Sequence, residues 1–129
     1  MSQQLEIAFK IRDRELARGV LKESWAPFNY REIVKVLPLR TRAYFLGPSL
    51  IYFPVVTRLK LERREEKTYQ AGSLIIMPYL NCIAVTLEGW KADRYEASPL
   101  GAVNQGLENL KKLKRGDIIL IEPASKNII

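Results

Sequence analysis

The sequence contains no histidine and only one cysteine among its 129 residues. The absence of histidine excludes Ser-His-Asp and Cys-His catalysis, because both need an imidazole base. It also removes the commonest zinc ligand, and a single cysteine cannot replace it. We therefore expect no bound metal. The cysteine, Cys82, stands in an apolar run, where a buried, chemically inert side chain is the expected role.

Glycine-rich phosphate loops are also missing, because Gly101 and Gly106 lack the rest of such a motif. We expect no cofactor. No stretch approaches the ~20 apolar residues of a membrane span, and the N-terminus lacks the basic start and apolar segment of a signal peptide. These absences predict a cytoplasmic protein with no membrane contact. The length predicts one domain over residues 1–129.

Basic residues are in excess, with 21 Lys and Arg against 14 Asp and Glu, for a net charge of +7. Residues 1–70 carry 14 basic and 8 acidic side chains, whereas residues 71–129 carry 7 and 6. A basic half can attract nucleic acid, acidic lipid or an acidic ligand. The alternative is a solvated, charge-rich surface without a specific partner. The charges of residues 62–67 sum to zero, so this cluster is interpreted as an exposed loop.

Alternating apolar and polar residues predict strands over most of the chain. Residues 5–11 and 16–22 form a predicted hairpin with a turn near Asp13-Arg14. Further strands are expected at residues 40–46, 49–56, 73–77, 82–87, 99–103 and 117–122. Residues 89–98 are interpreted as a loop. Short strands separated by Gly and Pro turns favour a closed barrel.

Two short helices complete the pattern. The first is expected to begin at an Asn29 cap, with Glu32 at the capping-box position, and to end before Pro38. The second covers residues 107–113, and Gly116 is its predicted C-cap. The cations of residues 111–115 suit the C-terminal end of this helix dipole. The predicted fold is mainly β: a closed antiparallel barrel of about eight strands with two short helices.

One segment resembles a known family. Leu100-Gly101-Ala102-Val103-Asn104-Gln105-Gly106-Leu107 resembles the cyclophilin signature, in which a strand reads Gly-x-Val and a helix opens with Gly-Leu. The continuation to Asp117 is similar to the small prokaryotic cyclophilin-like domains, and residues 71–78 and 51–53 match in the same order. The resemblance covers most of residues 29–122. It implies an eight-stranded antiparallel barrel with helices over its ends.

The departures from that family bear on activity. Cyclophilins that isomerise prolyl bonds carry an arginine in a Phe-His-Arg strand, followed by Phe-Met-x-Gln and Gln-Phe-Phe segments. The corresponding segments here are residues 41–46, 50–54 and 81–86, and they lack the histidine and the glutamines. No catalytic residue is therefore carried over, and we do not expect an enzyme.

The expected function is a non-catalytic binding module that holds a small ligand or an extended peptide in a barrel-side groove. The groove is predicted to combine aromatic side chains with arginines at its rim: Arg40, Arg42, Tyr44, Tyr52, Phe53, Tyr79 and Trp90. One alternative is a weak prolyl isomerase with Arg40 or Arg42 as its hydrogen-bond donor. Another is nucleic-acid binding by a stripe of Arg12, Arg14, Arg18, Arg58 and Lys60. A third is a structural subunit or a homodimer.

Overall fold

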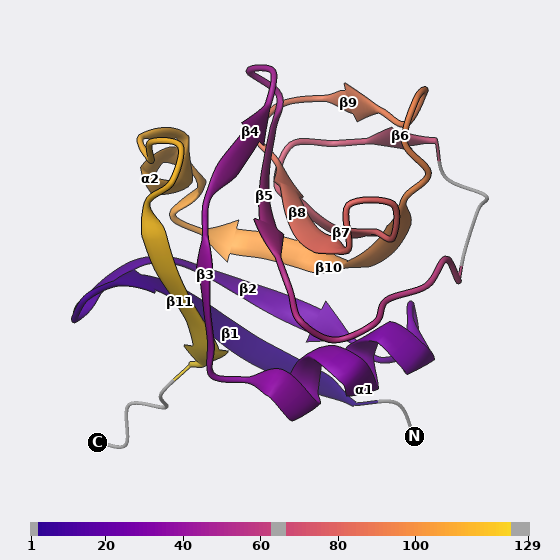
Figure 1. Cartoon of the computed structure of the whole chain (residues 1–129), viewed down its shortest axis with the longest axis horizontal. Helices are drawn as coiled ribbons and strands as arrows, with labels where there is room; N and C mark the ends of the chain where they lie inside the picture. The colour runs from indigo at the N-terminus through magenta and orange to yellow at the C-terminus, as the bar shows by residue number, and fades with distance from the viewer. Residues whose placement is uncertain (1–2, 63–66, 125–129) are drawn as a thin grey trace.

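The computed structural model describes residues 3–62 and 67–124. In chain order the strands are β1 (Gln4–Ile11), β2 (Arg14–Lys22), β3 (Leu39–Arg42), β4 (Tyr44–Leu46), β5 (Leu50–Pro54), β6 (Thr68–Tyr69), β7 (Ser73–Met77), β8 (Cys82–Thr86), β9 (Trp90–Lys91), β10 (Ser98–Gln105) and β11 (Ile118–Pro123). The helices are α1 (Pro27–Val36) and α2 (Leu107–Lys111). Figure 1 shows the strands curving around a common interior.

Nine strands form one antiparallel sheet in the order β3-β11-β1-β2-β10-β7-β8-β5-β4, and β6 pairs with β9 in a small second sheet. The two edges of the large sheet, β3 and β4, are separated only by Ala43. The backbone of Ala43 exchanges hydrogen bonds with Asp117 at 2.9 Å and Gly116 at 2.7 Å. The Thr41 hydroxyl donates to the carbonyl oxygen of Pro54 at 2.6 Å, which links β3 to β5. The sheet is therefore nearly closed into a barrel.

The strand pattern corrects the sequence-based prediction in three places. The described residues contain eleven strands rather than about eight, because β6 and β9 are two-residue strands without a periodic pattern and one expected strand is divided into two. The expected strand at residues 40–46 bends at Ala43 into two strands that pair with different partners. The expected loop at residues 89–98 contains β9 and the first residue of β10.

The helix ends also differ from the prediction. Helix α1 begins at Pro27, two residues before Asn29, and has no side-chain cap of its own. Glu62 replaces that cap, because its carboxylate accepts hydrogen bonds from the backbone N–H groups of Phe28 at 2.9 Å and Asn29 at 2.7 Å. Helix α2 ends at Lys111, so Gly116 is not its C-cap. Gly116 instead lies in the turn before β11 with a φ of 90°. Residues 63–66 of the expected charged loop lie outside the described residues.

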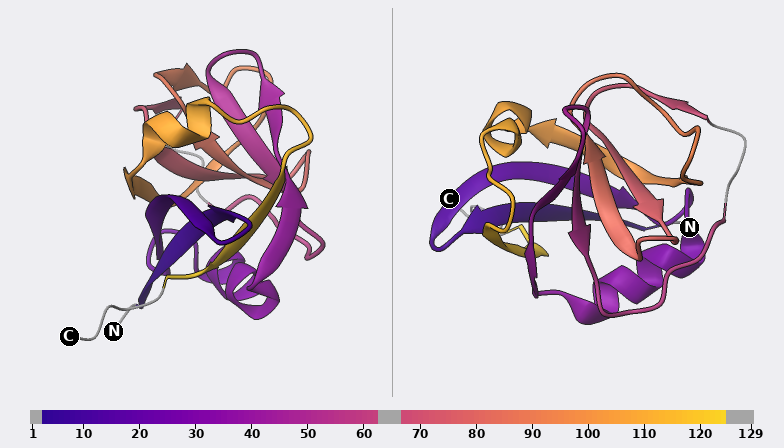
Figure 2. Two further views of the ribbon diagram at one scale, coloured as in Figure 1. Left: turned by 90° about the vertical axis from the view of Figure 1, so that its left-hand side faces the viewer. Right: turned by 45° about the horizontal axis from the view of Figure 1, so that its top comes forward.

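Two apolar cores hold these elements together. The larger fills the barrel and includes Phe9 and Phe53, Tyr30 and Ile33 of α1, and Leu110 of α2. The smaller lies between the outer face of β5, β7 and β8 and the β6–β9 sheet (Figure 2). Strand β8 is buried on both faces for this reason, as its continuous apolar run predicted. Within residues 3–62 and 67–124, no helix has the length and apolar character needed to cross a bilayer.

Candidate functional site

A groove lies on the outer face of the barrel where β3, β11 and the β1–β2 turn meet. Strand β3 exposes Arg40 and Arg42, because alternate side chains of a strand point to opposite faces. Arg40 lies opposite Leu120 in the β3–β11 ladder, and Arg42 lies opposite Ile118. The groove has a volume of about 470 Å³, which is within the ~300–1,000 Å³ of small-ligand sites. Its lining residues are Ile11, Arg12, Arg40, Arg42, Gly116, Asp117, Ile118 and Leu120.

Positive charge dominates this groove, whose lining contains three guanidinium groups and one carboxylate. The carboxylate, on Asp117, accepts a backbone hydrogen bond at 2.7 Å. Arg42 donates from Nη1 to the carbonyl oxygen of Gly116 at 2.9 Å, which holds its guanidinium at the rim. Among the described residues, neither Arg12 nor Arg40 forms an ion pair. Guanidinium groups in this arrangement favour carboxylate and phosphate ligands.

The β1–β2 turn supplies Arg12 at a conformational cost. Arg12 and Asp13 join the paired residues Ile11 and Arg14, and Arg12 has a φ of 55°. This left-handed region favours glycine or asparagine, and another residue costs about 1 kcal/mol or more there. Backbone strain of this kind concentrates at functional positions. The strained residue is here a lining residue of the groove.

The structure brings two of the seven predicted site residues, Arg40 and Arg42, together in the groove. Tyr44 and Tyr52 lie opposite one another in the β4–β5 ladder, and their rings stack with centroids 5.6 Å apart. Neither tyrosine lines the groove. The pair instead lies at the edge of the smaller core, against which Tyr52 packs.

The other three predicted residues lie in separate places. Phe53 is fully buried in the barrel core. Tyr79 is 81% exposed at the turn between β7 and β8, with its ring centroid 5.8 Å from that of Tyr95. Trp90 packs beside Tyr69 at 6.2 Å, in the β6–β9 sheet. The aromatic side chains therefore form no common surface with the groove arginines.

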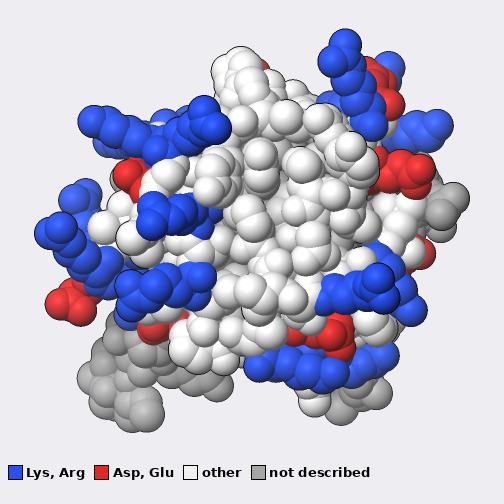
Figure 3. Space-filling view, in the orientation of Figure 1, with Lys and Arg blue, Asp and Glu red and all other residues white. Residues whose placement is uncertain are grey.

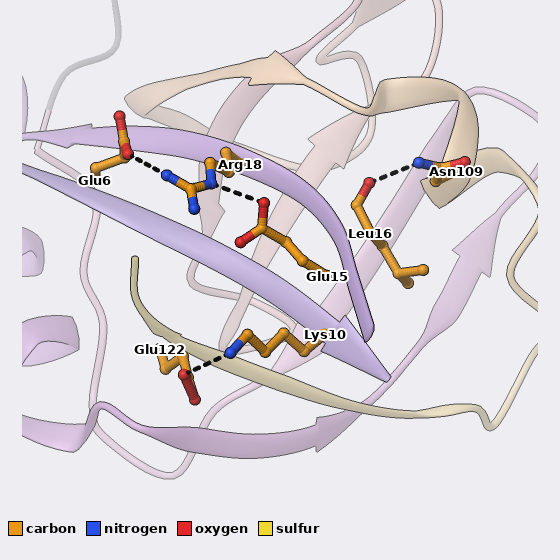
Figure 4. Close-up of polar contacts among 7 residues, drawn as sticks. All are labelled: Glu6, Lys10, Glu15, Leu16, Arg18, Asn109 and Glu122. Atoms are coloured by element: carbon orange, nitrogen blue, oxygen red, sulfur yellow. Dashed lines mark hydrogen bonds and ion pairs between the residues drawn. The ribbon is translucent and has the colours of Figure 1, made fainter. Parts of the chain in front are cut away.

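The outer face of β1 and β2 neutralises much of its own charge (Figure 4). Arg18 donates from Nε to Glu15 at 2.7 Å and from Nη1 to Glu6 at 2.9 Å. Lys10 pairs with Glu122 at 3.2 Å. Exposed pairs of this kind add only ~0–1 kcal/mol to stability, but they neutralise the cations that take part.

The structure does not form the expected stripe of Arg58 and Lys60 with the hairpin arginines. Lys60 lies beside the start of α1, where its Nζ is 4.0 Å from the centroid of the Phe28 ring. The β1–β2 turn lies on the other side of the molecule, at the far left of Figure 1. Lys60 and Arg12 therefore cannot contact the same short segment of a ligand.

Lys and Arg side chains lie on both sides of the view in Figure 3, and those at the left lie over α2, the β1–β2 turn and β11, with some acidic side chains among them. The basic rim is defined here as the exposed cations at the β1–β2 turn, of α2 and of the turn that leads from α2 to the groove residue Gly116: Arg14, Lys111, Lys112, Lys114 and Arg115. From the sequence alone, the cations of residues 111–115 were expected to interact favourably with the C-terminal end of the helix dipole. Their position beside the groove depends on the turn after α2. A hydrogen bond of 2.7 Å from the Gly116 N–H to the Ala43 carbonyl oxygen holds this turn against the barrel. No local sequence signal predicts that bond.

Nucleophilic or metal-assisted chemistry has little support among the described residues. In residues 3–62 and 67–124, no three cysteine or acidic side chains gather closely enough to hold a metal ion. Cys82 is fully buried in β8, and burial raises the pKa of its thiol to about 12. A thiol with this pKa contains almost no thiolate at neutral pH, and the thiolate is the nucleophile.

We expect Cys82 to react with Ellman's reagent at pH 8 at least ~100-fold more slowly in the folded protein than in urea. The folded state favours the neutral thiol, so Cys82 contributes to the free energy of unfolding. This contribution is complete below the pKa of the thiol in the unfolded chain, about 8.5. It is lost as the pH rises toward the folded pKa of about 12. Absorbance at 412 nm measures the reaction, and Cys82→Ser gives the background. Equal rates in buffer and urea would contradict the burial of Cys82.

The comparisons with known proteins show the fold. No protein-family model matches the chain, and no protein of curated function matches it. The chain is similar to the solution structure of the hypothetical protein AF2241 from Archaeoglobus fulgidus, with a TM-score of 0.73 and 19% identity over 96% of this chain and 98% of that chain. At this identity the similarity shows a shared fold and carries no activity. The chain is a mainly β protein with a nearly closed, barrel-like antiparallel sheet of nine strands.

Proposed function

We propose that the protein is a non-catalytic binding module that holds a small anionic ligand in the groove between β3, β11 and the β1–β2 turn. The observation that carries the proposal is that Arg12, Arg40 and Arg42 line one hollow together with Ile118 and Leu120. The guanidinium groups suit the oxygen atoms of a carboxylate or phosphate. Ile118, which is 45% exposed, offers an apolar surface for a hydrocarbon part of the same ligand.

An extended-peptide ligand and a prolyl isomerase are less well supported. Both functions were predicted with aromatic side chains beside the arginines, where a proline ring or peptide side chain could pack. No aromatic ring of the described residues lines the groove, and the predicted aromatic residues lie in separate parts of the structure.

We infer further that the barrel is of the cyclophilin type. The residues that carry the resemblance occupy the expected elements, since Gly101 lies in β10, Gly106 precedes α2, and β11 follows as the last strand. An experimental structure superposed on a prolyl-isomerase barrel tests this inference. A different order of strands around the two barrels would contradict it.

Phenyl phosphate is a suitable probe of the groove, because it joins one phosphate to one apolar ring. We expect Arg40→Gln and Arg42→Gln each to raise its Kd about tenfold. The loss of one hydrogen bond to a charged group costs about 1.5–3 kcal/mol, and 1.4 kcal/mol is a factor of ten. Titrations followed by ¹⁵N–¹H correlation spectra give both the Kd and the place of binding on this 14.9 kDa chain.

Arg58→Gln is the matched control, because it removes one exposed guanidinium outside the groove. Its Kd should stay within twofold of wild type. Phenol and inorganic phosphate, each with half of the probe's chemistry, should bind more weakly than phenyl phosphate. If Arg58→Gln weakens binding as much as Arg42→Gln, or if the amides of β3 and β11 do not shift, the proposal is wrong.

A further inference from the structure

The positive surface extends well beyond the groove. The groove arginines and the basic rim place eight cationic side chains around one side of the molecule: Arg12, Arg14, Arg40, Arg42, Lys111, Lys112, Lys114 and Arg115. Within the described ranges none of the eight takes part in an ion pair. The protein's own carboxylates therefore do not pair with these cations, and the surface keeps a net positive charge.

Acidic residues are a minority on this surface, where Asp13, Glu108 and Asp117 lie among the eight cations. The Lys10–Glu122 pair borders the groove, because Lys10 lies opposite the groove residue Leu120, and Arg18 holds Glu6 and Glu15 on β1 and β2 (Figure 4). The ion pairs neutralise Lys10 and Arg18, whereas the eight cations outnumber the three acidic residues among them. A net positive surface of this kind attracts a polyanion at long range.

We propose that the groove and the basic rim bind the sugar–phosphate backbone of a nucleic-acid duplex. One backbone phosphate lies against Arg12, Arg40 and Arg42, and neighbouring phosphates contact the lysines that follow α2. The proposal rests on the proposed function, because the same three arginines receive the phosphate group. It goes further by naming a polymer as the partner.

The arrangement of cations favours a polymer over a free metabolite. A small anion occupies the groove alone and leaves Lys111, Lys112, Lys114 and Arg115 without a partner. A backbone presents a phosphate at every nucleotide, so cations on both sides of the groove can each neutralise one. A sequence-independent mode follows, since phosphate contacts position a protein without reading bases.

The lining of the groove favours a duplex over a single strand. Proteins that bind single strands stack unpaired bases on aromatic side chains, and within residues 3–62 and 67–124 no aromatic ring lines this groove. In a duplex the bases stack on one another and only the charged backbone is presented. DNA and RNA duplexes share this chemistry.

The test is fluorescence anisotropy of the full chain with fluorescein-labelled 24-base-pair DNA and RNA duplexes and a 24-nucleotide oligo(dT). Salt is varied from 50 to 200 mM KCl. We expect both duplexes to bind, with a Kd on the order of 10⁻⁶–10⁻⁴ M at physiological salt, and oligo(dT) to bind more weakly. The slope of log K against log salt should be about −0.9 for each phosphate neutralised.

The decisive variant is the triple substitution Lys112→Gln, Lys114→Gln and Arg115→Gln, which changes the rim and none of the groove's lining residues. It should make the salt slope shallower by about 2.7, or 0.9 for each lost contact. Its phenyl phosphate Kd should stay within twofold of wild type. The matched control removes three exposed cations elsewhere, by Arg31→Gln, Arg58→Gln and Lys91→Gln, and should keep the wild-type slope.

The outcomes separate this inference from the proposed function. Loss of duplex binding in the rim variant alone, with phenyl phosphate still bound, supports it. If wild type binds phenyl phosphate but no duplex, or if both triple variants lose duplex binding equally, the inference is overturned and the proposed function stands. If wild type does not bind phenyl phosphate, the proposed function is wrong, and the groove is not the binding site of a backbone phosphate either. Tighter binding of oligo(dT) than of either duplex overturns the duplex as the partner.

Discussion

Gly101→Ala is expected to destabilise the protein by more than the ~1–3 kcal/mol of ordinary overpacking. Gly101 pairs with Leu21 where β10 runs beside β2. A Cβ atom at this position would overlap the carbonyl oxygen of Val20 and lie 2.9 Å from its carbonyl carbon. The obstacle is backbone, which cannot move aside as a flexible side chain can. The β2–β10 pairing must therefore open for the variant to fold.

Thermal unfolding followed by circular dichroism measures the effect, and a fall in Tm of more than ~10 °C is expected from a loss of this size. Gly89→Ala is the matched control, because a Cβ at Gly89 meets no atom within 4 Å. An exposed substitution of this kind should change stability by no more than ~0.5 kcal/mol. A Gly101→Ala variant that melts within ~2 °C of wild type would show that β10 does not approach β2 this closely.

The glycines of the segment that resembles the cyclophilin signature lie where two backbones approach closely. Gly106 has a φ of 83°, and a Cβ there would overlap the carbonyl oxygen of Leu16. Gly101 and Gly106 thus mark two places where β10 and the start of α2 approach β2 closely. Such a motif records the packing of backbones. It says nothing about the side chains on the outer face of β3 and β11, where the groove lies.

The long strands β1 and β2 were predictable because apolar and polar residues alternate along them, although Ala8 is buried as fully as its neighbours Ile7 and Phe9. The remaining elements depend on distant partners. The break between β3 and β4 follows from hydrogen bonds between Ala43 and residues 116–117, and α1 is capped by Glu62 from a separate loop. Neither interaction can be predicted from a short stretch of neighbouring residues, because the partners are far apart in the sequence.

The site was predictable to the extent that it lies on one strand. Arg40 and Arg42 stand two residues apart, so any exposed strand places both on one face, and the structure does so. Arg12 was missed as a groove residue because β11 lies between β1 and β3 in the sheet. That strand order is set by pairing across the whole chain, which the local pattern of residues 11–14 does not record.

Phe53→Ala is expected to reduce the free energy of unfolding by about 3–5 kcal/mol, the usual cost of removing a buried phenyl ring. Phe53 is fully buried, and its ring centroid lies 5.7 Å from that of Phe9 in the barrel core. A loss of this size is a large part of the ~5–15 kcal/mol that stabilises a typical domain. Urea unfolding followed by circular dichroism measures it. Tyr79→Ala is the control, and with Tyr79 81% exposed it should cost ~0.5 kcal/mol or less.

The two roles considered for Phe53, core residue and ligand contact, make opposite predictions for a milder substitution. Phe53→Leu keeps most of the apolar volume, so it should fold with a smaller loss of stability than Phe53→Ala. As a core residue outside the groove, it should leave the Kd of phenyl phosphate within twofold of wild type. A Phe53→Leu protein that unfolds like wild type but binds phenyl phosphate tenfold more weakly would make Phe53 a ligand contact. The separation of the arginines from the aromatic core, on which the anion-binding proposal depends, would then be wrong.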